Sequence, residues 1–133
     1  MDTLPDDFAA TLGRYHFFAG HADYMLGLLL TQYEEEPNAM GLSGGRLRSR
    51  LERFVPSHDG LRELLDGYEA MYERRNVLAH GVHHFSALGL ETWYIPIGGK
   101  GATAWSFQHS REQIEGMMQS WRNIVEACIE LLD

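Results

Sequence analysis

The segment at residues 72–81, YERRNVLAHG, places an arginine, an asparagine and a histidine close together, at Arg75, Asn76 and His80. A histidine titrates near neutral pH, so it can accept or donate a proton under cellular conditions. An arginine keeps its positive charge and can stabilise negative charge that develops on phosphorus. Metal-free RNA cleavage needs both: a group that acts on the 2′-hydroxyl or the leaving oxygen, and a cation beside the phosphorane.

Arg75 interrupts a run of apolar residues that otherwise has helical spacing. A charge is rare on such a stripe unless it has a partner. Two explanations stay open: the guanidinium serves a functional site, or it forms a buried ion pair with Glu69 or Asp23. In the second case, His80 would be a cation favoured by the C-terminal end of its helix. The apolar positions of the stripe are Leu61, Leu64, Leu65, Tyr68, Met71, Leu78, Ala79 and Val82.

The angular spacing of the motif limits what one helix can do. On an ideal α-helix Arg75 and His80 point about 140° apart, and Asn76 lies on the edge that carries His80. One straight helix therefore cannot direct Arg75 and His80 at the same bond. Either the helix deforms toward Gly81, or the site takes groups from elsewhere, which a two-fold dimer pairing two copies of this helix would supply.

The charge of the chain is unevenly distributed. The formal net charge is −8, whereas residues 46–75 hold seven arginines and six acids. The planar fork of arginine suits bidentate contacts with phosphate. The candidate RNA-binding residues are therefore Arg46, Arg48, Arg50 and Arg74. The alternative is an ordinary solvated helical face.

Apolar periodicity and breaking residues predict four helices. The first spans about residues 6–35, and the loop PNAMGLSGG leads to a short, arginine-rich second helix that ends at VPSHDG. The third spans about residues 60–80, where Asp59 can cap its start and Gly81 its end. The fourth opens with a capping box, Ser110 with Gln113, and its apolar stripe includes Cys128, which we expect to be a core thiol.

The stretch between the third and fourth helices has β character. Its sequence, FSALGLETWYIPIGGKGATAWSF, alternates, is rich in Trp, Tyr, Ile and Thr, and contains a GGKG turn. These features favour a β-hairpin at about residues 83–108, with room for a third short strand. The predicted fold is mainly α: a single domain over residues 1–133, built as an antiparallel four-helix bundle with this β-hairpin inserted between the third and fourth helices.

Composition narrows the cellular setting. No apolar run approaches the roughly 18 residues that a membrane-spanning helix needs, so no membrane partner is expected. The N-terminus, MDTLPDDF, is acidic and lacks the pattern of a secretory signal. The chain has one cysteine, so no internal disulfide can form. A cytoplasmic location is the natural expectation.

The segment Arg75-Asn76-Val77-Leu78-Ala79-His80, at the end of a long helix in a small helical bundle, resembles the signature of HEPN domains (higher eukaryotes and prokaryotes nucleotide-binding). Many members carry an arginine, a polar residue and then a histidine. The resemblance implies a metal-independent endoribonuclease that acts as a homodimer, with Arg75 and His80 at a composite site and Asn76 positioning them. It covers the four-helix frame and leaves the hairpin outside.

The resemblance leaves the biological role open. It allows a toxin or defence role, with an antitoxin protein as partner. However, Val82 stands where toxins paired with a nucleotidyltransferase antitoxin often have a tyrosine. Other HEPN-like proteins are non-catalytic, so a nucleotide- or protein-binding homodimer is the alternative.

Several histidines also raise the question of a metal. They are His80, His83 and His84, with His16 and His21 on the first helix. Zinc sites use histidines at such spacings, but the chain has no second cysteine, and Gly81 separates the histidines in orientation. Solvated histidines in a polar loop are the better explanation, and we expect neither a metal nor a cofactor.

Overall fold

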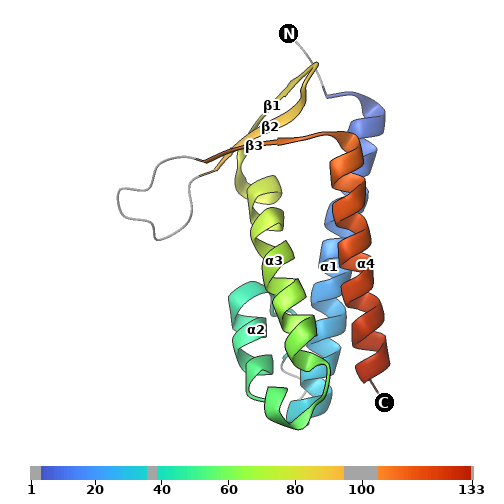
Figure 1. The fold of residues 1–133 in the computed structure, drawn as a ribbon, viewed down its shortest axis with the longest axis vertical. Helices are drawn as coiled ribbons and strands as arrows, with labels where there is room; N and C mark the ends of the chain where they lie inside the picture. The colour runs from blue at the N-terminus through green and yellow to red at the C-terminus, as the bar shows by residue number, and fades with distance from the viewer. Residues whose placement is uncertain (1–3, 36–38, 95–104, 133) are drawn as a thin grey trace.

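The computed structural model describes residues 4–35, 39–94 and 105–132. It is mainly helical, with a small antiparallel sheet at one end of the long helices (Figure 1). The mainly α class and the β insertion between the third and fourth helices are confirmed. Among the described residues, no helix is both long and apolar enough to cross a membrane.

The helices begin and end close to where periodicity predicts. One expectation was wrong: the N-cap of the third helix is Gly60, at φ 86, and no side chain caps it. A left-handed glycine makes the turn there, so Asp59 lies one position too early to act as the cap. The elements are α1 (Asp6–Glu34), α2 (Gly44–Glu52), a 3-10 turn (Val55–Ser57), α3 (Leu61–His80) and α4 (Arg111–Leu131).

Within the described residues the sheet has three strands in the order β1-β2-β3, all antiparallel. They are β1 (Val82–Ser86), β2 (Gly89–Tyr94) and β3 (Trp105–His109). The structure thus has the third strand for which the sequence left room, and β1 starts directly after α3. Polar histidines early in β1 hide its alternation from sequence analysis. The GGKG turn expected at 98–101 lies outside the described residues.

A glycine closes the junction between α3 and the sheet. Gly81 is the C-cap of α3, at φ −76 and ψ 169, so its backbone is extended rather than left-handed. A Cβ atom there would lie 2.3 Å from Thr92 Cγ2 and 2.6 Å from Val77 O. Glycine is therefore needed for close approach, because β2 packs directly against the end of the helix that carries His80.

The core lies between the long helices. Trp121 of α4 is fully buried, and its ring contacts Tyr15 of α1 and Tyr68 of α3 at centroid distances of 6.5 and 6.0 Å. Cys128 is also fully buried, and burial raises the pKa of its thiol to about 12. The expectation of a core thiol is confirmed.

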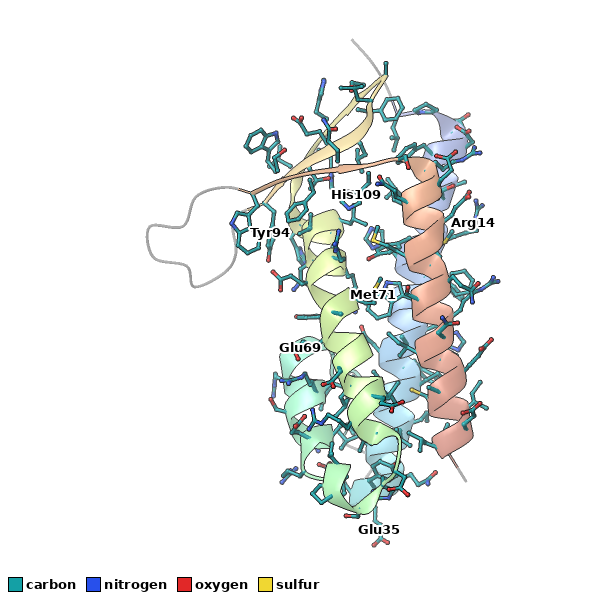
Figure 2. The ribbon with its side chains drawn as sticks, in the orientation of Figure 1. Arg14, Glu35, Glu69, Met71, Tyr94 and His109 are labelled. Atoms are coloured by element: carbon teal, nitrogen blue, oxygen red, sulfur yellow. The ribbon has the colours of Figure 1, made fainter. Side chains whose placement is uncertain are left out.

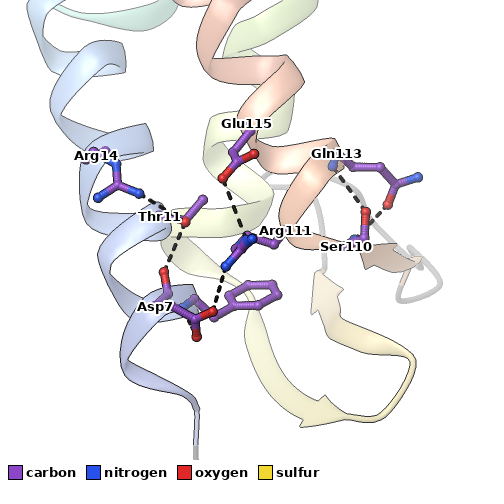
Figure 3. A network of polar contacts seen from close by, with 8 residues as sticks. Asp7, Thr11, Arg14, Ser110, Arg111, Gln113 and Glu115 are labelled. Carbon is purple, nitrogen blue, oxygen red and sulfur yellow. Dashed lines mark hydrogen bonds and ion pairs between the residues drawn. The ribbon is translucent and has the colours of Figure 1, made fainter.

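Polar contacts hold the starts of α1 and α4 together (Figure 3). Arg111 donates to Asp7 Oδ2 at 2.6 Å and lies 3.7 Å from Glu115. The predicted capping box is present: Gln113 N donates to Ser110 Oγ at 3.1 Å, and Ser110 N donates to Gln113 Oε1 at 2.8 Å. These contacts fix the point where β3 passes into α4.

Candidate functional site

Arg75 has a partner on α1. Its guanidinium forms an ion pair with Asp23, and the two side chains are only 14% and 17% exposed. The hydroxyl of Tyr68 donates to Asp23 Oδ1 at 2.5 Å and accepts the backbone N–H of Gly44 at 2.8 Å. Hydrogen bonds and an ion pair therefore connect Gly44 at the start of α2, Tyr68 of α3, Asp23 of α1 and Arg75. Of the two ion-pair partners considered from sequence, Asp23 is the one observed, and Glu69 pairs with another arginine.

Aromatic rings surround the guanidinium. Its Cζ atom lies 4.7 Å from the centroid of the Tyr72 ring and 5.9 Å from that of Trp121. Burial works against the charge of Arg75, but Asp23 together with Tyr68 and Tyr72 outweighs it, and the pKa of Arg75 is raised. Burial and the same carboxylate also raise the pKa of Tyr68. The site thus keeps a permanent cation in a partly dry environment, where electrostatic interactions are stronger than in water.

The structure does not bring the motif residues into mutual contact. Because α3 is helical through His80, Arg75 turns toward α1 while His80 is exposed at the helix end. Asn76 is half-buried, and neither it nor His80 has a side-chain hydrogen bond or ion pair within the described ranges. The helix does not deform toward Gly81, so any site that uses both Arg75 and His80 needs groups from other elements.

His16 is one such group. The Arg75–Asp23 contact fixes the register of α1 and α3, which run in opposite directions (Figure 1). His16 lies seven residues before Asp23 on the same helix face, about 10.5 Å nearer the sheet. His80 lies about 7.5 Å beyond Arg75 in the same direction. Both histidines therefore lie nearer the sheet than the Arg75–Asp23 pair does, His16 on the face of α1 that carries Asp23 and His80 on a face of α3 about 140° from Arg75.

The electrostatics of His16 agree with this placement. Although its side chain reaches solvent, partial desolvation lowers the pKa of His16, and its neighbours Arg75, His83 and His80 lower it further. These effects favour the neutral ring of His16, which is the form that a proton acceptor needs. From the sequence, His16 was a candidate only as a metal ligand, because the register between two helices far apart in the chain cannot be read from local spacing.

Of the four arginines proposed to bind RNA, two form ion pairs with glutamates and two are exposed in different concavities. Arg48 pairs with Glu69 at 3.1 Å, and Arg50 pairs with Glu34. Arg46 is exposed and lines an open concavity of about 640 Å³ at the start of α2, together with Ser43, Gly45, Ser49, Arg50 and Tyr72. Arg74 is also exposed but lines a different cavity, on the α4 side of α3.

The histidines considered as metal ligands do not form a centre. Within the part of the chain that the structure describes, no three His, Cys, Asp or Glu side chains are grouped to hold a metal ion. His83 Nδ1 lies 2.9 Å from Thr92 Oγ1. The nearby histidines are therefore better suited to proton transfer or to solvation than to coordination.

No protein-family model matches the chain, and comparison with curated proteins and with solved structures finds no significant similarity.

Proposed function

We propose that this chain is a HEPN-like, metal-independent endoribonuclease, cytoplasmic and homodimeric, with Arg75, Asn76 and His80 in its active site. One observation carries the proposal. Asp23 holds the mostly buried cation Arg75 between α1 and α3, and His16 lies close enough to Arg75 and His80 for both to lower its pKa. The antiparallel course of α1 and α3, with α4 packed against both, supports the single four-helix bundle that the resemblance implies.

The side chains supply the parts that such a reaction needs. Asp23 contacts one guanidinium nitrogen of Arg75, and a guanidinium has five N–H donors, so others remain for phosphate oxygens. In the proposed reaction His16, whose lowered pKa favours the neutral ring, takes the proton of the 2′-hydroxyl. The 2′-oxygen then attacks phosphorus, the bond to the 5′-oxygen breaks, and His80 gives that oxygen a proton. The product is a 2′,3′-cyclic phosphate.

A route for the RNA backbone leads from α2 to this seam. Tyr72 lines the concavity that contains Arg46, and its ring also contacts the guanidinium of Arg75. A strand whose phosphates lie at Arg46 would therefore continue toward Arg75. Arg50 also lines the concavity, while Arg48 is held by Glu69 beside it. Arg74 lies off this route.

The outer face of α1 supports the proposed homodimer. Phe17 is 68% exposed and Tyr24 is 53% exposed, and seven residues separate them, so they project from the same side of the helix. Pairing with a second copy would cover both rings and bring a second set of motif residues nearby. In a toxin or defence system, an antitoxin protein would be a further partner.

The proposal is tested by incubating wild type and His80→Ala with a mixed RNA pool, with and without a chelator. We expect wild type to leave 2′,3′-cyclic phosphate ends whether or not the chelator is present, and His80→Ala to leave the pool intact. Cleavage that stops on chelation, or equal cleavage by both proteins, would rule the proposal out.

One observation favours a second candidate, a non-catalytic nucleotide- or protein-binding module. Arg75 is mostly buried in its ion pair with Asp23, and the helix directs His80 away from it. An RNA-binding protein that retains this pair for stability would show the same contacts. Saturable RNA binding without cleavage would favour this candidate.

A further inference from the structure

Two separate contacts hold the guanidinium of Arg75. One Nη nitrogen donates to Asp23 Oδ2 in the ion pair, which ties one edge of the planar group. A single hydrogen bond sets a direction but leaves the plane free to turn about that direction. The second contact is with the face of the Tyr72 ring, whose centroid lies 4.7 Å from Cζ. An edge contact and a face contact together fix both the place and the tilt of the guanidinium.

Tyr72 is the nearer of the two rings beside Arg75. The Trp121 ring lies 5.9 Å from Cζ, which is close to the limit of about 6 Å for a cation–π contact. Tyr72 is half-buried and lines the concavity that contains Arg46, whereas Arg75 itself does not line it. Tyr72 therefore borders both the concavity proposed for RNA and the cation proposed for the phosphorane.

The ring of Tyr72 is itself held on two sides. It stacks on the ring of Tyr68, at a centroid distance of 6.0 Å and an interplanar angle of 25°. Its hydroxyl lies against Gly44, where a Cβ atom would be 2.2 Å from the Tyr72 oxygen. Only glycine fits there, and the left-handed φ of 61 favours glycine as well. In Figure 2, Glu69 marks the place where α3 passes α2, and Tyr72 is the third residue after it.

Gly44 supports both contacts on Arg75. Its backbone N–H donates to the Tyr68 oxygen at 2.8 Å, and the Tyr68 hydroxyl donates to Asp23 Oδ1 at 2.5 Å. The edge contact through Asp23 and the face contact through Tyr72 therefore both lead back to the start of α2. Docking of α2 and the orientation of Arg75 are coupled through the two tyrosines.

We propose that Tyr72 is the positioning residue for Arg75: its ring holds the guanidinium plane, so that the N–H groups left free by Asp23 keep one direction. Its effect on catalysis rests on the ribonuclease proposal. Tyr72 acts through Arg75 and takes no part in proton transfer. Misplacing a catalytic group by about 1 Å can cost about a hundredfold in rate, so loss of the ring should be visible in the chemical step.

The test compares Tyr72→Leu, which removes the ring, with Tyr72→Phe, which keeps it, in cleavage of a mixed-sequence RNA oligonucleotide. We expect Tyr72→Leu to lower kcat at least about tenfold and to change KM less than about threefold, because the phosphorane exists only in the transition state. Tyr72→Phe should bring kcat back to within about threefold of wild type, since a phenyl ring keeps the cation–π contact.

The matched control is Phe54→Leu. Phe54 is also half-buried at the edge of the core, but its ring contacts Tyr33 rather than Arg75. This variant loses a ring of similar burial, so a general effect of lost packing should appear in it too. We expect it to cut RNA as wild type does.

A second measurement does not need cleavage. The rate of rotation about the Nε–Cζ bond of Arg75, measured by NMR in RNA-free protein, should be at least about tenfold faster in Tyr72→Leu than in wild type. It should be unchanged in Phe54→Leu. If wild type does not cleave RNA, the ribonuclease proposal fails, and this rate alone decides whether Tyr72 positions Arg75.

Three results would overturn the positioning role. The first is an equal rotation rate in Tyr72→Leu and wild type, or a kinetic effect confined to KM. The second is a loss of kcat in Tyr72→Phe as large as in Tyr72→Leu, which would assign the effect to the hydroxyl. The third is faster cleavage by Tyr72→Leu, which would mean that the ring blocks access to Arg75. Tyr72→Met, which also lacks a ring, replaces the leucine variant if circular dichroism shows that variant unfolded.

Discussion

At the scale of single residues, the pair Arg75–Asp23 explains why a charge lies in the middle of an apolar helix face. The carboxylate reaches across from α1, and Tyr68 fixes it with a second hydrogen bond. Removing one member of a mostly buried pair leaves the other charge without a partner. Such a pair gives a catalytic or binding guanidinium a defined position, at the cost of making stability depend on its partner.

We predict that Asp23→Ala lowers the free energy of unfolding by about 2–4 kcal/mol, because Arg75 and the Tyr68 hydroxyl both lose their acceptor. Urea unfolding measures this loss. Asp7→Ala is the matched control, since Asp7 pairs with Arg111 where both side chains are largely exposed, and its loss should be below about 1 kcal/mol. Equal losses in the two variants would contradict a structural role for the buried pair.

At the scale of elements, local patterns predicted much of the fold. The apolar period of α1 and the capping box of Ser110 and Gln113 depend on residues close in sequence, and both are confirmed. The choice of Asp23 over Glu69 was not decided by sequence, because it depends on how α1 and α3 are aligned. For the same reason, the sequence did not identify His16 as a neighbour of the motif. The unsatisfied Nδ1 of His109, which has no hydrogen-bond partner among the described residues, could not be predicted either, because it depends on how three elements meet.

The arginine-rich helix α2 gives an element-scale prediction. Arg46 is exposed in the concavity that leads to Tyr72, so Arg46→Glu should weaken RNA binding and lower the slope of log affinity against log salt concentration by about 1. Fluorescence anisotropy over a series of salt concentrations measures the slope. Arg122→Glu makes the same charge change on α4 and should leave it unaltered. An unchanged slope in Arg46→Glu would mean that α2 does not bind RNA phosphates and that its arginines are an ordinary solvated face.

At the scale of the whole molecule, the net charge of −8 repels a polyanion, so the proposed RNA binding would depend on local surfaces rather than on the overall field. The concavity at Arg46, which Tyr72 of α3 also lines, is the surface proposed for RNA. The exposed rings of α1 provide a second surface, of a different kind.

We predict a dimer at micromolar concentration, measured by light scattering, because Phe17 and Tyr24 together expose a hydrophobic face on α1. Phe17→Asp combined with Tyr24→Asp should give a folded monomer, since neither side chain belongs to the core. The control is Ile129→Asp, which changes an exposed apolar residue of α4 and should not affect the mass. A monomeric wild type would contradict the homodimer.

The most direct test of the proposed activity is the single-turnover rate of RNA cleavage by wild type, Arg75→Met and His80→Gln, measured at temperatures where circular dichroism shows all three folded. We predict that each variant loses about a hundredfold or more in rate, because one lacks the cation for the phosphorane and the other lacks the proton donor. His80 contributes only about 0.3–1 kcal/mol to stability through the helix dipole, so His80→Gln should stay folded. Two folded variants that cut RNA as fast as wild type would contradict the ribonuclease proposal.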